Sequence, residues 1–333
     1  MLETATHPVR TLVLGGSGHL GAALVRAALA RGDEVTAAGR QKAPASLEGL
    51  GVRLVCGDDR EPGAIASWVA GHDLVLDAAA PYPVRAFTGG GKALEHARRR
   101  TAELLAAVRA AGCPLGCVGS FVTCVEPDGG TAGWGARAGR LLHPYFAVKS
   151  AIEELLLDAA VDGARIALVN PVTCLGPWDS RPGNEALLPR LLRGELPMVA
   201  RDPIGVVDVR DAAAALLAAL ERERFGRRHL LVGRRVEAAG LARLACELTG
   251  ARPPALQVPA AWTIAPAWWL EAVLAPWGRD SPSPALIPLL VAAQASLPER
   301  GDETALGIEP RPLEETLRDA VRWYRRVGAL PAS

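Results

Sequence analysis

Residues 10–32 read RTLVLGGSGHLGAALVRAALARG, and this stretch decides the fold. An apolar run leads into a turn with glycines at 15, 18 and 21, and an amphipathic helical pattern follows. The first glycine allows a tight turn, the second lets the backbone approach a pyrophosphate, and the third lets helix pack on strand. Free N–H groups at the helix start favour an anion. The pattern predicts a dinucleotide-binding strand–turn–helix unit, with contacts from Gly15, Ser17, Gly18, His19, Leu20 and Gly21.

Arg40 follows the second predicted strand, residues 34–38. A site that prefers NAD usually has a carboxylate here, which binds the ribose 2′-hydroxyl. Arg40 stands in that place instead, and a guanidinium pairs well with a 2′-phosphate. The sequence therefore favours NADP(H). NAD(H) is the alternative if Arg40 only stacks on the adenine.

Further apolar runs, each followed by small or acidic residues, continue the alternation of strands and helices. These runs are residues 52–56, 73–76 and 115–118. Together with a helix at 92–111 they predict an α/β fold with a doubly wound parallel Rossmann sheet. Asp58 and Asp59 follow one run, and Asp58 is placed to accept from the adenine amino group. Ala79 and Ala80 follow another, and their small side chains would let the cofactor lie across the sheet edge.

Tyr145 and Lys149 stand four residues apart in the segment HPYFAVKSAIEELLL. The chain has only three tyrosines and three lysines, so this spacing is improbable by chance. Residues at i and i+4 share a helix face, and a nearby ammonium lowers the pKa of a phenol toward a working range. Ser120, at the carboxyl end of a strand, adds a second hydroxyl where ligands of such sheets bind. These three residues are the predicted catalytic set.

Taken together, these segments resemble the extended short-chain dehydrogenase/reductase family over almost the whole chain. The matching segments are GGSGHLG (15–21), GDD (57–59), DAAA (77–80), GS (119–120), YFAVK (145–149), NPVTCLGP (170–177), VVDVRDAAAALLAALE (206–221) and RPLEETLRDAVRWYRR (311–326). The second half is most similar to the branch that holds dihydroflavonol reductases, 3β-hydroxysteroid dehydrogenases and hopanoid-associated epimerase-like proteins.

The resemblance implies a role for each matching residue. Tyr145 would be the general acid/base, Lys149 would lower its pKa and hold the nicotinamide ribose, and Ser120 would bond the reacting oxygen. Pro171 and Thr173 would lie beside the nicotinamide. A homodimer through the helices at roughly 92–111 and 145–160 is also implied.

The chain departs from the family pattern at three places. The stretch HARRRTAELL has no Asn where many relatives carry one before the catalytic serine. Asp77 stands where a His is common, and Cys124 stands where a Tyr is usual. The catalytic set is intact, but these departures weaken any transfer of substrate identity.

The second half of the chain predicts a smaller, discontinuous substrate domain. Residues 1–170 with about 204–233 would form the NADP-binding Rossmann domain, and residues 171–203 with 234–333 the substrate-binding domain. Aromatic side chains suit an apolar pocket, although each could equally belong to the core. The expected lining residues are Phe121, Trp134, Trp178 and Trp268. The glycine-rich stretch 127–144 predicts a loop over the active site.

Residues 260–276, AAWTIAPAWWLEAVLAP, form the most apolar part of the chain. They include Glu271 and internal prolines, and they fall short of the roughly 20 residues needed to span a bilayer. No integral membrane segment is therefore expected. The stretch is predicted as core or lid, with a substrate wall or a peripheral contact with a membrane surface as alternatives.

The composition of the chain indicates which binding partners and which cellular location to expect. The 37 basic and 36 acidic residues give a net charge of +1, which provides no electrostatic case for nucleic acid. The six cysteines form no CxxC pair and have no histidine at zinc-like spacing, so no metal is expected. Reduced thiols and the lack of a signal-peptide pattern in MLETATHPVR predict a cytoplasmic protein.

The leading hypothesis is an NADP(H)-dependent oxidoreductase acting on a ketone or secondary alcohol of an apolar substrate. Steroid-like, terpenoid and aromatic secondary metabolites fit equally. An NAD(P)-dependent epimerase or dehydratase of nucleotide sugars is the alternative. A nonenzymatic nucleotide-sensing regulator is the third reading, and it would predict a broken catalytic set.

Overall fold

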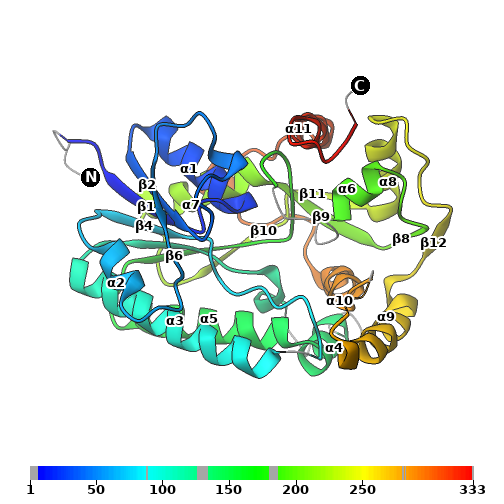
Figure 1. Ribbon diagram of the computed structural model, residues 1–333, viewed down its shortest axis with the longest axis horizontal. Coiled ribbons are helices and arrows are strands. Elements are labelled where there is room, and N and C mark those ends of the chain that lie inside the picture. The colour runs from blue at the N-terminus through cyan, green and yellow to red at the C-terminus, as the bar shows by residue number, and fades with distance from the viewer. Residues whose placement is uncertain are drawn as a thin grey trace.

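A seven-stranded, wholly parallel sheet forms the centre of the computed structural model, which describes residues 7–87, 89–125, 134–179, 187–279, 281 and 283–331 (Figure 1). The strand order is β3-β2-β1-β4-β5-β6-β10. The strands are β1 (Arg10–Leu14), β2 (Glu34–Gly39), β3 (Arg53–Cys56), β4 (Leu74–Asp77), β5 (Leu115–Val118), β6 (Ile166–Pro171) and β10 (Arg228–Leu231). The strand order reverses beside β1, so the crevice at the carboxyl ends of β1 and β4 is the expected ligand site. The predicted doubly wound fold is confirmed.

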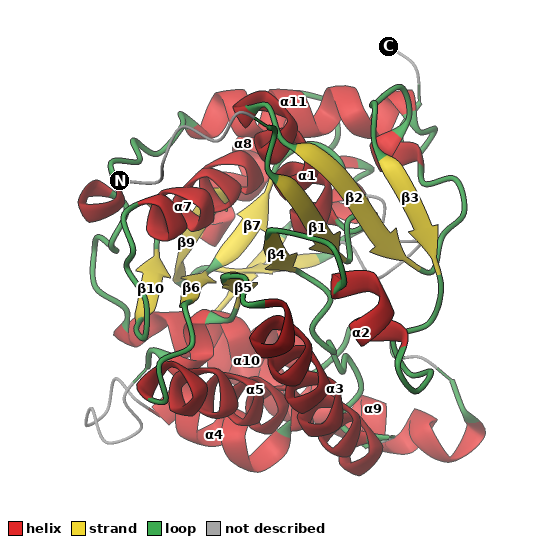
Figure 2. Ribbon diagram, turned by 90° about the vertical axis from the view of Figure 1, so that its left-hand side faces the viewer, coloured by secondary structure: helices red, strands yellow, loops and turns green. Residues whose placement is uncertain are grey.

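Helices cover both faces of this sheet, as Figures 1 and 2 show. On one face α1 packs against α7, and on the other α3 packs against both α2 and α5. Their bounds are α1 (His19–Arg31), α2 (Ala64–Val69), α3 (Gly90–Ala111), α5 (Pro144–Val161) and α7 (Val209–Glu221). Side chains alternate along a strand. Val13 of β1 therefore joins the core under α1 and α7, while Leu12 and Leu14 join the core under α3 and α5.

The second half adds smaller sheets and a third hydrophobic core. β9 joins β7 and β11 in a three-stranded sheet, and β8 pairs with β12. These strands are β7 (Thr173–Leu175), β8 (Met198–Ala200), β9 (Pro203–Asp208), β11 (Arg234–Glu237) and β12 (Leu256–Val258). The helices are α6 (Leu187–Leu192), α8 (Ala238–Glu247), α9 (Ala260–Leu274), α10 (Leu286–Ala293) and α11 (Leu313–Arg326). The third core draws buried side chains from α6, α8 and α11.

The glycine-rich stretch 127–144 is partly helical, so the prediction of a loop is wrong for its second half. Residues Trp134–Leu142 form α4, which packs against α10. A Cβ on Gly135 would meet the backbone of Ala292 at 2.5 Å, and one on Gly139 would collide with the Phe146 ring. These glycines permit close helix packing. Residues 126–133 lie outside the described residues.

Among the residues that the structure describes, no helix has both the length and the apolar character needed to cross a membrane.

Candidate active site

The glycine turn between β1 and α1 has the geometry of a phosphate cradle. Gly15 adopts φ +72°, a left-handed conformation that favours glycine. A Cβ on Gly21 would collide with the Gly15 carbonyl oxygen, which also accepts the Gly18 N–H at 2.9 Å. No side chain caps the start of α1 at Gly18, and its first turn holds no acidic residue. The N–H groups and positive dipole end of α1 therefore suit a pyrophosphate.

Arg40 lies at the end of β2, beside this turn. Its neighbour Gly39 approaches Ser17 so closely that a Cβ there would lie 3.3 Å from the Ser17 hydroxyl oxygen. The Arg40 side chain is exposed, next to the crevice that the turn borders. A guanidinium in this position can reach a ribose phosphate on a nucleotide held by the turn.

Asp58 and Asp59, the two acidic residues predicted to contact the cofactor, have different hydrogen-bond partners. Asp58 accepts the Arg60 backbone N–H at 3.0 Å. Asp59 is engaged by the Arg100 guanidinium at 2.6 Å, so its carboxylate serves an internal ion pair. Asp58 is thus the better placed of the two for a cofactor.

The remaining predicted cofactor residues follow their strands as expected. Ala79 and Ala80 come directly after β4, and a Cβ on Gly15 would meet the backbone of Ala78 and Ala79 at 3.0 Å. Pro171 ends β6, and Thr173 begins β7, where its hydroxyl accepts from Gln294 at 3.2 Å. Leu20 packs against the core under α1.

The three predicted catalytic residues meet at the carboxyl end of β5. The Ser120 Oγ and Tyr145 Oη lie 2.8 Å apart in a hydrogen bond, and both side chains are buried. Lys149 is also buried, one turn further along α5, with its Nζ 5.8 Å from the centre of the Tyr145 ring. The site therefore presents two hydroxyls toward one point, with a positive charge behind them.

His143 fixes the helix turn that carries Tyr145. It caps α5 by accepting the Tyr145 N–H at its Nδ1, 3.2 Å away, so its Nε2 carries the proton and donates to the Val84 carbonyl at 3.1 Å. Burial lowers the pKa of His143, in agreement with this neutral form. Through these two hydrogen bonds, His143 connects the start of α5 with segment 81–87.

The pKa of Tyr145 moves opposite to the sequence prediction. Burial raises it well above its usual value, and the neighbouring Tyr82 adds to the rise, while the Ser120 hydrogen bond opposes it. Burial also lowers the pKa of Lys149, and the carboxylates of Glu153 and Asp77 oppose that fall. Desolvation is the largest cause of the rise in the Tyr145 pKa. Tyr145 is therefore a neutral phenol near pH 7, which suits a proton donor.

Glu153 is a central site residue that sequence reasoning missed. It lies one turn beyond Lys149 and is 0% exposed. Its carboxylate accepts the Ser120 backbone N–H at 2.9 Å, the Asn170 amide at 2.9 Å and the Arg228 guanidinium at 2.8 Å, together with the Thr123 hydroxyl. This single side chain anchors the turn that holds Ser120. The sequence shows only an acidic residue eight positions after Tyr145 on the same helix. Its partners are remote in sequence, so this position alone did not predict its role.

A second buried network lies behind Lys149. Arg100 of α3 makes two 2.8 Å hydrogen bonds to the Asp77 carboxylate and a third bond to Asp59. This Arg100 pairing keeps Asp77 ionised, with its pKa lowered against the effect of burial. Asp77, a departure from the family pattern, is thus the partner of a buried guanidinium.

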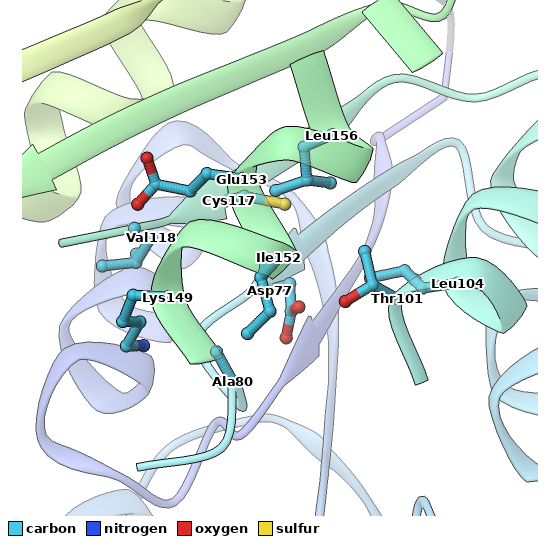
Figure 3. A pocket seen from close by; sticks show the side chains of 11 residues that line it. Asp77, Ala80, Thr101, Leu104, Cys117, Val118, Lys149, Ile152, Glu153 and Leu156 are labelled. Carbon is cyan, nitrogen blue, oxygen red and sulfur yellow. The ribbon is translucent and has the colours of Figure 1, made fainter. Parts of the chain in front are cut away.

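Figure 3 shows a small cavity in this region, lined in part by Asp77, Lys149 and Glu153. It lies between α3, α5 and the ends of β4 and β5, and its volume of ≈ 10 Å³ leaves room for at most one water molecule. A cavity of this size can hold no substrate.

Two aromatic residues of segment 81–87 connect Tyr145 with helix α9. The Tyr82 ring contacts the Tyr145 ring edge to face, with centres 4.9 Å apart, while Tyr82 stays 48% exposed. Phe87, at the far end of the segment, contacts Trp268 of α9 at 4.6 Å. Tyr82 and Phe87 are thus pocket candidates that sequence reasoning did not name.

The structure describes the side chains of three of the four predicted pocket residues, and each has different partners. Phe121 is buried in the core that also contains Tyr145. Trp178 adopts φ +72° and packs under Arg26 of α1, whose guanidinium lies 4.1 Å from the ring centre. Trp268 joins the aromatic group on α9. The side chain of Trp134 lies outside the described part of the chain.

A glycine cradle for a dinucleotide beside a buried Ser–Tyr–Lys set defines an NAD(P)-dependent oxidoreductase with a Rossmann fold. The chain belongs to the NAD dependent epimerase/dehydratase family, whose model matches residues 11–233. The suspected extended short-chain dehydrogenase/reductase membership is thereby confirmed.

The relatives agree with the suspected branch. A Synechocystis protein named as a dihydroflavonol 4-reductase is 31% identical, covering 95% of this chain and 94% of its own. The sterol demethylase protein B of Methylococcus capsulatus is 29% identical, covering 96% and 99%. The crystal structure of a nucleoside-diphosphate-sugar epimerase from Pseudomonas aeruginosa matches with a TM-score of 0.72 at 25% identity, covering 97% and 99%.

Proposed function

We propose that this protein is an NADP(H)-dependent oxidoreductase that transfers hydride to or from a ketone or secondary alcohol of an apolar substrate. The 2.8 Å bond between the Ser120 and Tyr145 hydroxyls, with Lys149 behind it, carries the proposal. An oxygen that takes up both donors would sit where negative charge develops during carbonyl reduction. Bound nicotinamide supplies or accepts the hydride.

Side chains of this protein move the proton that accompanies hydride transfer. In reduction, the Tyr145 Oη gives its proton to the substrate oxygen, and in oxidation it takes a proton back. Ser120 holds that oxygen through its Oγ. The Lys149 charge stabilises the phenolate that remains, which offsets the cost of ionising a buried tyrosine.

The aromatic approach to Tyr145 supports an apolar substrate. Tyr82, Phe87 and Trp268 form a series of rings that leads from α9 to Tyr145 and suits an apolar substrate. Two relatives carry dihydroflavonol and sterol in their names. Steroid-like, terpenoid and aromatic ketones all remain within the proposal.

A nucleotide-sugar epimerase or dehydratase is the second candidate, and the match to the P. aeruginosa epimerase favours it. Such an enzyme returns its hydride to the substrate and consumes no cofactor overall. A panel of steroid and aryl ketones with NADPH should show one cofactor oxidised per alcohol formed. Turnover of UDP-glucose with NAD⁺ or NADP⁺, and with no net change in the amount of oxidised cofactor, would favour the epimerase instead.

The cofactor preference is testable at Arg40. Arg40→Asp should raise the KM for NADPH about 10- to 100-fold and improve the use of NADH, because it replaces the partner of the 2′-phosphate with a carboxylate that suits a 2′-hydroxyl. The ratio of kcat/KM for the two cofactors measures this shift. The exposed neighbour Lys42 offers a control as Lys42→Asp, and an unchanged ratio in the Arg40 variant would show that Arg40 does not contact the phosphate.

The pKa shifts predict the alkaline limb of reduction. The pKa of Tyr145 is raised above 10.0 and that of Lys149 is lowered from 10.5, so Lys149 loses its proton first as the pH rises. The charge that supports the phenolate is then lost, and kcat/KM for ketone reduction should fall with an apparent pKa below 10.5. A profile that stays flat beyond that pH would contradict this assignment.

The proposal also includes a division into two domains, a cytoplasmic location and a homodimer. The division into a Rossmann domain (1–170 with 204–233) and a substrate domain is supported by the separate core under α6, α8 and α11. All six cysteines are free thiols, which supports a cytoplasmic location. A homodimer through α3 and α5 stays a prediction.

A further inference from the structure

The outer face of α9 is apolar along its whole length. Trp262, Trp269 and Val273 are 72%, 65% and 54% exposed, and Trp277 in the following turn is 70% exposed. Their spacing of seven, four and four residues places them on one side of the helix. The only charged residue of α9, Glu271, is buried on the opposite side. Contiguous exposed apolar surface of this kind marks an interaction site.

The inner face of α9 is already occupied. Ala260, Ile264 and Ala267 are buried there, and α9 packs against α10. The Glu271 carboxylate accepts the backbone N–H groups of Ala86 and Ala285, which locks the helix in this orientation. These contacts fix the orientation of α9. The exposed side chains of Trp262, Trp269, Val273 and Trp277, the tryptophan stripe, therefore face outward.

Positive charge borders this stripe. Arg279 stands two residues after Trp277, and it lines a crevice at the end of α9 together with Arg85 and Glu271. On the neighbouring α4, Arg137 and Arg140 are exposed beside Leu141, which is 86% exposed. Helices α4 and α9 both pack on α10 and both lie along the lower edge of the molecule in Figures 1 and 2. Among the described residues of these three helices and the turn after α9, the one carboxylate is Glu271, which is buried, lines the same crevice as Arg279 and accepts two backbone N–H groups.

We propose that the exposed faces of α9 and α4 dock on a bilayer surface that carries anionic phospholipid. Indole rings favour the boundary between headgroups and acyl chains, and arginines beside them attract anionic headgroups. A second protein copy would not require the arginine border. The partner is therefore a lipid surface, which α9 lies on and does not cross.

Docking would also place the active-site approach at the membrane. Segment 81–87 contacts α9 through Phe87 and contacts the catalytic Tyr145 through Tyr82. An apolar substrate dissolved in the bilayer would reach Tyr145 along these rings without crossing bulk water. This last step rests on the proposed function, whereas the docking itself does not.

Co-sedimentation with sucrose-loaded vesicles tests the docking. The full chain should bind vesicles of phosphatidylcholine with phosphatidylglycerol, bind pure phosphatidylcholine far less, and lose binding as salt is raised. The double variant Trp262→Ser/Trp277→Ser should lower the partition coefficient at least tenfold. Val161→Ser, which removes an 88% exposed apolar side chain at the end of α5, is the matched control and should bind like the parent protein.

Three outcomes would overturn the docking. They are no binding to either vesicle, equal binding to both vesicles, and a smaller molecular mass of the tryptophan variant in light scattering with unchanged vesicle binding. The last would assign the face to a second copy. Reduction of a water-soluble ketone without vesicles reports on the proposed function separately, since neither Trp262 nor Trp277 touches the catalytic set.

Discussion

Tyr145→Phe should lower kcat for ketone reduction by about 10³-fold while leaving the Kd for NADPH nearly unchanged. The variant keeps the ring, which packs against Tyr82 and Phe146, and removes only the hydroxyl that meets Ser120. A positioned proton donor is lost and the cofactor cradle at Gly15–Gly21 is untouched. Steady-state kinetics and NADPH fluorescence titration measure the two quantities.

Tyr324→Phe is the matched control for that loss. Tyr324 is equally buried, but its hydroxyl donates to Asp179 near α11 and makes no contact with the catalytic set. Its rate should stay close to that of the parent protein. If Tyr145→Phe kept most of the rate, another group would have to move the proton, and the catalytic assignment would be wrong.

Glu153→Ala should destabilise the protein by about 3 kcal/mol, a fall of about 5 °C or more in Tm. It removes the acceptor from the Ser120 backbone, Asn170, Thr123 and Arg228 together. Donors left buried without a partner carry the full desolvation cost. Activity should fall as well, because the turn that holds Ser120 loses its anchor.

Glu154→Ala tests whether that loss depends on position. Glu154 is the next residue of α5 and is exposed, so its removal should change Tm by less than about 1 °C. Glu153→Gln keeps one acceptor oxygen and should fall between the two. Equal stability of Glu153→Ala and Glu154→Ala would show that the buried network contributes little, which would remove Glu153 as a positioning residue.

Features with local causes could be predicted from the sequence. The glycine turn needs only neighbouring residues to specify it, and Tyr145 and Lys149 share a face because both lie on one helix. The alternation of strands and helices then predicts a parallel sheet, and the apolar run at 115–118 matches the bounds of β5.

Features with remote causes could not be predicted in the same way. Glu153 meets Arg228 across 75 positions, and nothing near either residue announces the pair. Lys149 was expected to set the pKa of Tyr145, but burial, which no sequence pattern measures, has the larger effect. Gly135 suggested a loop although it serves close packing against Ala292.

Transfer of deuterium from NADPH labelled at nicotinamide C4 tests the central claim most directly. With a ketone from the panel, the alcohol product should carry one deuterium at the carbinol carbon, and one NADP⁺ should form for each alcohol. Ser120, Tyr145 and Lys149 would then act at a carbon–oxygen centre with net reduction. An inverted nucleotide sugar formed with NAD⁺ or NADP⁺ and no net cofactor change, together with no labelled alcohol from any ketone, would contradict the account.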